Sequence, residues 1–169
     1  MEGTPQDQHI ASAFDRDLEA IQGQIMKMGG LVEAAILDAA KSLETRDLEL
    51  AGAVRTRDRQ IDLLEEQINF EAARLIALRA PMGTDLRTVL TVMKVSGNLE
   101  RVGDYAKNIA KRTSVLARLA AVNGSSGALR RMAQQVEAML KDVLDAYIQR
   151  DAELAENVRQ RDFEVDQMY

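Results

Sequence analysis

The sequence contains no cysteine and no tryptophan, and it has two prolines and one histidine in 169 residues. Without cysteine the chain forms no disulfide, no zinc–thiolate site and no thiol nucleophile. The lone histidine, His9, is expected at the surface or at a helix cap. It argues against the paired Glu-x-x-His ligands of a di-iron oxidase and against histidine-based acid–base catalysis. A glycine-rich phosphate loop and a nucleophile elbow are also missing. With these groups excluded, the carboxylates of Asp and Glu are the main candidates for a functional site.

Long apolar segments and an excess of basic residues are lacking as well. No stretch approaches the roughly 20 apolar residues needed to span a bilayer, and residues 1–7 have neither the basic nor the apolar part of a signal peptide. The net charge of -5 argues against nucleic acid, since a phosphate-binding face usually carries an excess of Lys and Arg. We therefore expect a cytoplasmic protein that reaches a membrane only through a partner.

The residues that dominate the sequence are good helix formers, and apolar residues recur every three or four positions. This pattern predicts an all-α protein whose helices run up and down with short connections. Thr45 is expected to cap the second helix, Pro81 to end it, and Thr84 or Asp85 to cap the third. Residues 123–127 are expected to form a flexible turn. The expected helices cover residues 7–45, 47–80, 84–119, 128–149 and 151–169.

An internal repeat with an offset of 104 residues organises the chain. At this offset residues 28–62 align without a gap with residues 132–166, and 15 of the 35 positions are identical. The densest identity covers residues 46–58 and 150–162, where Arg and Asp recur at the same places. Convergence of two amphipathic helices would not reproduce the placement of charged residues. We therefore interpret the repeat as the duplication of a helical unit.

The duplication predicts tandem three-helix bundles of the spectrin-like, up-and-down kind, with the second bundle incomplete. Residues 1–120 form the first three-helix unit, and residues 121–169 supply two helices of the second, the last of them cut short. A counterpart of the third helix would follow beyond Tyr169. We therefore expect the last two helices to expose an apolar stripe, to pair with another chain or to rearrange.

Three pairs of acidic residues four positions apart are the main candidates for a functional site. On a helix, residues four apart lie on the same face, and two carboxylates placed in this way repel each other unless a positive charge lies between them. Hard cations prefer oxygen ligands, which such pairs supply. The three pairs are Asp58 and Asp62, Glu100 and Asp104, and Asp162 and Asp166.

The position of Pro81 predicts that two of these pairs meet. Residue 62 lies 19 positions before Pro81, and residue 100 lies 19 positions after it. An antiparallel hairpin that turns at Pro81 brings residues equidistant from the turn to the same height. Glu65, one turn beyond residue 62, is a weaker candidate. We predict one metal site formed by Asp58, Asp62, Glu100 and Asp104.

Two alternatives remain open for the acidic pairs. They could be solvated surface carboxylates that form ion pairs with Arg55, Arg59 and Arg101, which contributes little to stability. Clustered carboxylates with a divalent metal would also suit a metalloenzyme that acts on phosphate esters. The sequence places no nucleophile or general base for such a reaction.

Several segments resemble the PhoU family of phosphate-transport regulators. The stretch 98–109, Asn-Leu-Glu-Arg-Val-Gly-Asp-Tyr-Ala-Lys-Asn-Ile, is similar to the signature segment of that family. The duplication also matches its two tandem three-helix bundles. Further similar positions are Phe14-Asp-x-x-Leu18 with Met28-Gly29, and Asp58-x-x-Ile-Asp62-x-x-Glu65.

The resemblance implies a non-enzymatic regulator of phosphate uptake and phosphate-starvation signalling. Members of the family act between the ATPase subunit of the phosphate ABC transporter and a phosphate-sensing histidine kinase, and they help to keep the starvation response off when phosphate is plentiful. Many form homodimers. They bind metal at acidic-x-x-x-Asp motifs, with iron, manganese, magnesium or zinc as candidates here. The matching ligands are Asp58, Asp62, Glu100 and Asp104, and Asp162 and Asp166 as half of a second site.

Overall fold

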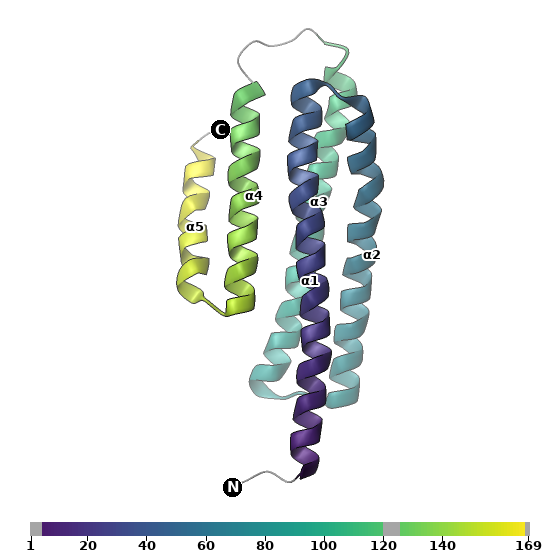
Figure 1. The fold of residues 1–169 in the computed structure, drawn as a ribbon, viewed down its shortest axis with the longest axis vertical. Coiled ribbons are helices and arrows are strands. Elements are labelled where there is room, and N and C mark those ends of the chain that lie inside the picture. The colour runs from purple at the N-terminus through teal and green to yellow at the C-terminus, as the bar shows by residue number, and fades with distance from the viewer. Residues whose placement is uncertain (1–4, 120–125, 168–169) are drawn as a thin grey trace.

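The chain is an all-helical bundle in the computed structural model, which describes residues 5–119 and 126–167, with side chains from 13 to 119 and from 127 to 167. No strand occurs among these residues, and none of their helices has the length and low polarity that a membrane crossing requires. The all-α fold predicted from the sequence is confirmed. The turn expected at 123–127 lies mostly outside the described residues. The helices are α1 (Pro5–Thr45), α2 (Leu48–Arg79), α3 (Gly83–Leu116), α4 (Ser126–Gln149) and α5 (Ala152–Asp166) (Figure 1).

The first three helices pack around a common apolar core, and each of them contacts both of the others (Figure 1). Complete burial of one aliphatic or methionine side chain stabilises a fold by about 1.5–3 kcal/mol, so this core dominates the energetics of the unit. The packing fixes α2 and α3 side by side. The fully buried side chains include Ile25, Met28 and Val32 of α1, Ile61 and Ile68 of α2, and Val89 and Val92 of α3.

The turn between α1 and α2 and the turn between α4 and α5 have the same structure. Arg46 and Arg150, which are 104 residues apart, both adopt the left-handed conformation, with φ of 57° and 55°. The next residues, Asp47 and Asp151, cap the following helices, and each carboxylate accepts a hydrogen bond at 2.9 Å from the backbone N–H three residues on. The repeat seen in the sequence is therefore also a repeat of backbone structure.

A salt bridge between helices is repeated at the same offset. Arg57 of α2 bonds to Asp38 of α1 with a distance of 2.6 Å between Nη2 and Oδ2. Its counterpart Arg161 on α5 forms the equivalent salt bridge with Asp142 of α4. The α4–α5 hairpin is thus built like the α1–α2 hairpin, which supports duplication over convergence.

Two of the expected helix caps are wrong. Thr45 still belongs to α1, where its hydroxyl donates to a backbone carbonyl one turn earlier. The third helix begins at Gly83, ahead of Thr84 and Asp85, and the residue in its cap position, Met82, makes no side-chain hydrogen bond. The carboxylate of Asp47 caps α2 in place of Thr45. At the start of α3 the backbone N–H of Asp85 bonds to the carbonyl of Met82.

The turn between α2 and α3 lies where Pro81 predicts it. Helix α2 stops at Arg79, and Ala80 adopts a left-handed φ of 46° while its N–H bonds to the carbonyl of Ile76. Gly83 also has a positive φ of 56°, which glycine adopts without strain. The chain therefore reverses within a few residues and sends α3 back along α2.

The hairpin of α4 and α5 lies beside α1 (Figure 1). Helix α4 packs against α1, and α5 packs against α4. Gly29 permits the close approach of α4, because a Cβ at this position would overlap Cδ1 of Leu144. A Cβ at the adjacent Gly30 would meet nothing within 4 Å. Of these two glycines in the middle of α1, only the first is required by packing.

Equivalent positions in the two repeats differ in burial, because α3 covers α2 of the first repeat and, among the residues described, does not cover α5 of the second. Asp58 of α2 is 4% exposed and Ala51 is also buried, whereas their counterparts Asp162 and Ala155 on α5 are exposed. The described part of the α4–α5 hairpin also exposes apolar side chains, and such exposure was one of the three outcomes expected for these helices. The large ones are Val143, Ile148 and Phe163.

Candidate functional site

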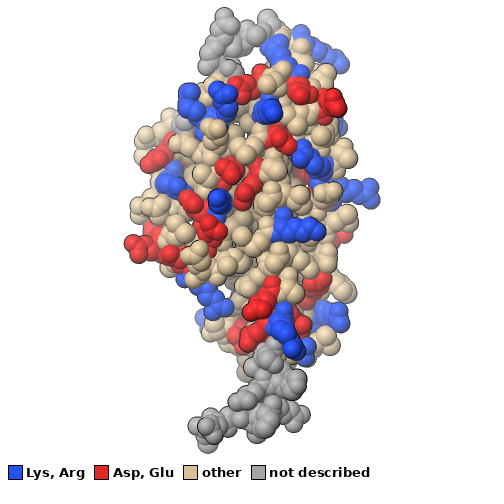
Figure 2. Space-filling model, in the orientation of Figure 1, with Lys and Arg blue, Asp and Glu red and all other residues tan. Residues whose placement is uncertain are grey.

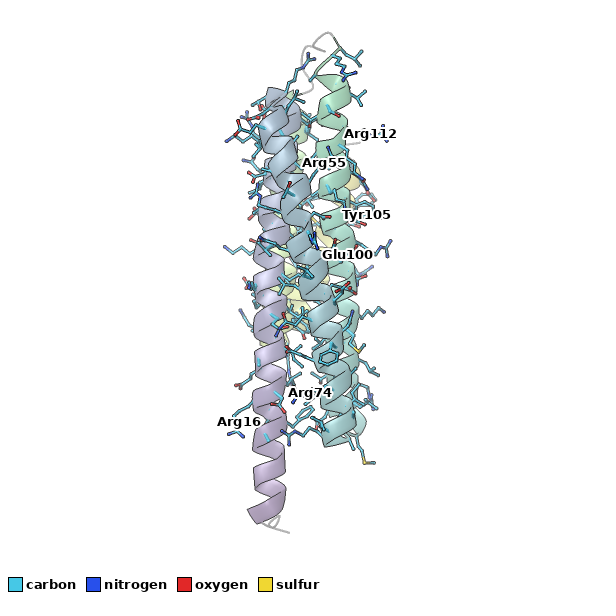
Figure 3. The ribbon with its side chains drawn as sticks, turned by 90° about the vertical axis from the view of Figure 1, so that its right-hand side faces the viewer. Arg16, Arg55, Arg74, Glu100, Tyr105 and Arg112 are labelled. Carbon is cyan, nitrogen blue, oxygen red and sulfur yellow. The ribbon has the colours of Figure 1, made fainter. Side chains whose placement is uncertain are left out.

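The four carboxylates of the predicted site meet where α2 and α3 run antiparallel, and Figure 3 shows Glu100 midway along this hairpin. Burial raises the pKa of Asp62, and the charge of Asp58 raises it further; Lys107 opposes this rise and Asp104 adds to it. Burial also raises the pKa of Glu100, together with the charges of Asp104 and Asp62. Each pair thus acts electrostatically on the other. The structure therefore brings the first and second acidic pairs together.

Gly103 explains how the two helices come so close at this height. It is buried, and a Cβ at this position would lie 3.0 Å from Cδ1 of Ile61 and 3.8 Å from Oδ1 of Asp58. A carbon–carbon contact of 3.0 Å is shorter than the optimum of about 3.5–4.0 Å. The glycine of the Glu-Arg-Val-Gly-Asp segment therefore lets α2 approach α3 beside the carboxylates.

Lys107 is the functional side chain that the sequence reasoning missed. Asp58 is the only charged residue in the buried class among the described side chains, and its carboxylate forms a salt bridge with the ammonium of Lys107. The same ammonium donates to Oδ1 of Asp104 at 2.9 Å. These two hydrogen bonds raise the pKa of Lys107, so it stays charged. The signal was available, because a lysine three positions after an aspartate lies on the same helix face.

The surface alternative fits Asp58 poorly. Asp58 is buried, and the salt bridges of the site carboxylates are made by Lys107 rather than by the neighbouring arginines. Figure 2 shows a different situation on the face formed by α1, α4 and α5, where acidic and basic side chains are interspersed. Asp58 differs from that surface by its burial, and Asp58 and Asp104 differ from it by their shared ammonium partner. The other three site carboxylates are half-buried.

The donor set suits a hard cation by chemistry and charge, but Lys107 lies among the donors. Three of the four carboxylates interact with the ammonium of Lys107, and the fourth, Glu100, is repelled by Asp62 and Asp104. Carboxylate oxygens are the ligands that hard cations prefer. In the present arrangement no three acidic or histidine side chains of the described residues converge closely enough to hold an ion. Lys107 bonds to one carboxylate from each helix. Its ammonium is the group that would have to move before a metal could bind there.

The remaining candidates lie elsewhere. Asp162 and Asp166 are exposed on α5, which packs against α4, so the structure does not bring them to the first two pairs. Glu65 adds to the rise in the pKa of Glu100, although its own Oε1 accepts a hydrogen bond from Asn69 at 2.7 Å. His9 falls among the residues whose side chains are not described. We call Asp58, Asp62, Glu100, Asp104 and Lys107 the carboxylate–lysine cluster.

The fold and the site define a duplicated, up-and-down helical bundle with a carboxylate–lysine cluster in its first unit. The family model described as the PhoU domain matches residues 25–113 and again residues 129–169. The chain belongs to the PhoU family. The two matched segments correspond to the first repeat and to the part of the second repeat that the chain contains.

Relatives and solved structures agree with this assignment. The phosphate-specific transport system accessory protein PhoU homolog of Zymomonas mobilis is 42% identical over 161 residues, which are 95% of this chain and 68% of the relative. The homolog of Caulobacter vibrioides is 39% identical over 162 residues, which are 96% of this chain and 70% of the relative. PhoU from Pseudomonas aeruginosa has a crystal structure that matches with a TM-score of 0.87 at 36% identity, over 92% of this chain and 75% of that one. The phosphate transport system regulatory protein PhoU from Streptococcus pneumoniae matches with a TM-score of 0.83 at 32% identity, over 92% and 73%.

Proposed function

We propose that this chain is a non-enzymatic, cytoplasmic regulator of phosphate uptake and phosphate-starvation signalling. The observation that carries the proposal is its likeness, at 39–42% identity over nearly its whole length, to proteins named as accessory proteins of the phosphate-specific transport system. In this role it is an adaptor between the ATPase subunit of the phosphate transporter and a sensor histidine kinase. It acts as a negative regulator and reaches the membrane through these partners.

The proposal includes a metal ion held by Asp58, Asp62, Glu100 and Asp104, and a homodimer in solution. When bound, a divalent or iron-type cation would supply the positive charge that these carboxylates lack. The charges around Asp62 and Glu100 support this part: after burial, neighbouring carboxylates are the main causes that raise the pKa of both groups, and Lys107 is the one cation that opposes them. The exposed pair on α5 supplies two carboxylates at most, and we assign it no separate site.

A binding experiment tests the adaptor role. The purified chain is immobilised, and the transporter ATPase subunit and the cytoplasmic part of the kinase from the same genome are passed over it. Each should bind saturably, and the measurement is repeated for Asp62→Ala and Asp104→Ala. An unrelated helical bundle of similar charge serves as the control surface. If neither partner binds the unaltered chain or the variants, the adaptor role is wrong.

A genetic experiment tests the regulatory role independently of the binding partners. In a strain that lacks its own gene for this protein, a phosphate-starvation reporter should be active even in phosphate-rich medium. Expression of this chain should lower the reporter signal. A reporter that stays active despite normal amounts of folded protein would contradict the negative regulatory role.

A further inference from the structure

Lys107 occupies a central position in the carboxylate–lysine cluster. Its ammonium bonds to Asp58 on α2 and to Asp104 on α3, so that one cation joins the two helices. The Asp58 side chain is 5% exposed and the Lys107 side chain 27% exposed. The ammonium is therefore anchored on a buried carboxylate, while the lysine side chain keeps some contact with solvent.

Helix geometry explains why the lysine at this position reaches both aspartates. Side chains on a helix lean toward its N-terminus, which for α3 is the end at Pro81. Lys107 therefore leans from its own level back to that of Asp104, three positions earlier. Asp58 lies opposite Asp104, because residues 58 and 104 are each 23 positions from Pro81. The ammonium thus meets the two carboxylates at the height where the helices approach each other.

The other charges around the ammonium are negative. Asp62 raises the pKa of Glu100, and the charges of four further carboxylates raise the pKa of one or both of these groups: Asp58, Asp104, Glu65 and Glu66. Among the charged groups that act on these two carboxyls, Lys107 is the one that lowers a pKa. A single positive charge therefore faces several carboxylates, and a cation of higher charge would be attracted to them more strongly.

We propose that Lys107 is the resident cation of this cluster: its ammonium holds the position between Asp58 and Asp104 that a divalent ion would need, and so sets the affinity of the cluster for divalent cations. A metal ion binds when the partly exposed Lys107 side chain swings out of the cluster. This inference rests on the metal-binding part of the proposed function, and it assigns to Lys107 a role beyond that of the carboxylates.

Manganese binding to the metal-free, full chain tests the proposal. Isothermal titration with Mn²⁺ is performed on the unaltered protein, on Lys107→Met and on Lys111→Met. Lys111 is the matched control, because it lies one turn further on α3 and its ammonium contacts Asn108 at 3.4 Å. Removing a positive charge from the binding position should lower the Kd of Lys107→Met about tenfold or more. The Kd of Lys111→Met should match that of the unaltered protein.

Every result of this titration either supports or overturns the proposed role of Lys107. Binding by Lys107→Met alone also supports the proposal, because it shows that the lysine closes the site. Equal Kd values for the unaltered protein and Lys107→Met overturn it while leaving metal binding intact. No binding by either protein overturns it together with the metal-binding part of the proposed function. If Lys107→Met is unfolded without metal, folding on addition of Mn²⁺ supports the proposal, and failure to fold overturns it.

A second readout uses unaltered protein that binds Mn²⁺. Amine-reactive labelling followed by mass spectrometry compares Lys107 with Lys111 before and after saturation with Mn²⁺. Displacement of the ammonium should increase the labelling of Lys107 severalfold relative to Lys111. Unchanged or decreased labelling of Lys107 in the metal-bound protein would overturn the proposal, because the ion would then bind without displacing the lysine.

Discussion

Lys107 of α3 forms a salt bridge with the buried carboxylate of Asp58 on α2. The pair connects the two helices that meet at Pro81 and lies beside Gly103, where the helices come close. A buried carboxylate without its cation is costly. The packing of α2 against α3 and the salt bridge between Lys107 and Asp58 therefore depend on each other. Substitutions at Gly103 test the packing, and substitutions at Lys107 and Asp58 test the salt bridge.

Loss of the lysine should destabilise the metal-free protein. For Lys107→Met we expect the free energy of unfolding to fall by about 2–3 kcal/mol, less than for a fully buried pair because the lysine is partly exposed. Urea unfolding in the presence of a chelator measures the change. Lys111→Met should stay within about 0.5 kcal/mol of the unaltered protein. An equal loss in both variants would show that Lys107 contributes only as a surface residue.

The pair should also show coupling in a double-mutant cycle. Asp58→Asn removes the buried charge, so adding Lys107→Met to it should cost much less than Lys107→Met alone. Urea unfolding of the two single variants and the double variant gives the coupling free energy. Additive losses would contradict a direct pairing of the two side chains.

Burial of Asp62 and Glu100, together with repulsion among the carboxylates, predicts how stability depends on pH. The pKa values of Asp62 and Glu100 are raised from their ordinary 3.8 and 4.5, so the folded state binds their protons more tightly than the unfolded state does. Their contribution to stability is complete below these ordinary values and is lost as pH rises through the raised ones. Asp62→Asn and Glu100→Gln should therefore each stabilise the metal-free protein at neutral pH, by about 0.5 kcal/mol after allowance for solvent screening.

Thermal unfolding as a function of pH measures this effect. The gain of both variants over the unaltered protein should vanish at about pH 3, where the carboxyls are protonated in folded and unfolded states alike. A gain that persists there would show that the substitutions act through packing. Destabilisation at neutral pH would contradict the repulsion itself.

The glycine beside the cluster gives a test of helix approach. Gly103→Ala would place a Cβ 3.0 Å from Cδ1 of Ile61, and we expect this overlap to cancel the helix-propensity gain of alanine, so that the free energy of unfolding does not rise. Gly52→Ala on α2 is the matched control, because a Cβ there meets nothing within 4 Å. In a helix interior that change should stabilise by about 0.5–1 kcal/mol. Equal effects of the two substitutions in urea unfolding would contradict the close approach at Gly103.

A second pair of glycines tests the contact between α1 and α4. Gly29→Ala would push a Cβ into Leu144, whereas Gly30→Ala meets no neighbour. We expect Gly29→Ala to loosen the α4–α5 hairpin from α1 and to accelerate its cleavage in limited proteolysis. Gly30→Ala should be cleaved no faster than the unaltered protein. Faster cleavage in both variants would indicate a general loss of helix stability instead.

Much of the fold follows from features that the sequence displays directly. Pro81 forces the turn between α2 and α3, and equal spacing on both sides of it brings the acidic pairs to one height. The repeat identified the α4–α5 hairpin as a copy of α1–α2, and the structure extends the copy to the turns at Arg46 and Arg150 and to their aspartate caps. These features are local or depend on counting along the chain, so tertiary packing was not needed to predict them.

The missed features depend on tertiary contacts. The spacing of Asp104 and Lys107 places both on one face of α3, but the salt bridge from Lys107 to Asp58 joins two helices, and no pattern within one helix reveals it. Thr45 was expected as a cap because its residue type suits one, but a left-handed Arg46 moved the boundary to Asp47. The exposure of Asp162 reflects α3, which covers α2 and has no equivalent over α5 in the described residues.

Lysine ammonium resonances measured by ¹H–¹⁵N NMR on the metal-free protein test the account most directly. We predict one ammonium signal with slowed proton exchange, which belongs to Lys107, is absent in Lys107→Met and is lost in Asp58→Asn. Lysine signals that all exchange alike, or a protected signal that survives in Asp58→Asn, would contradict the account.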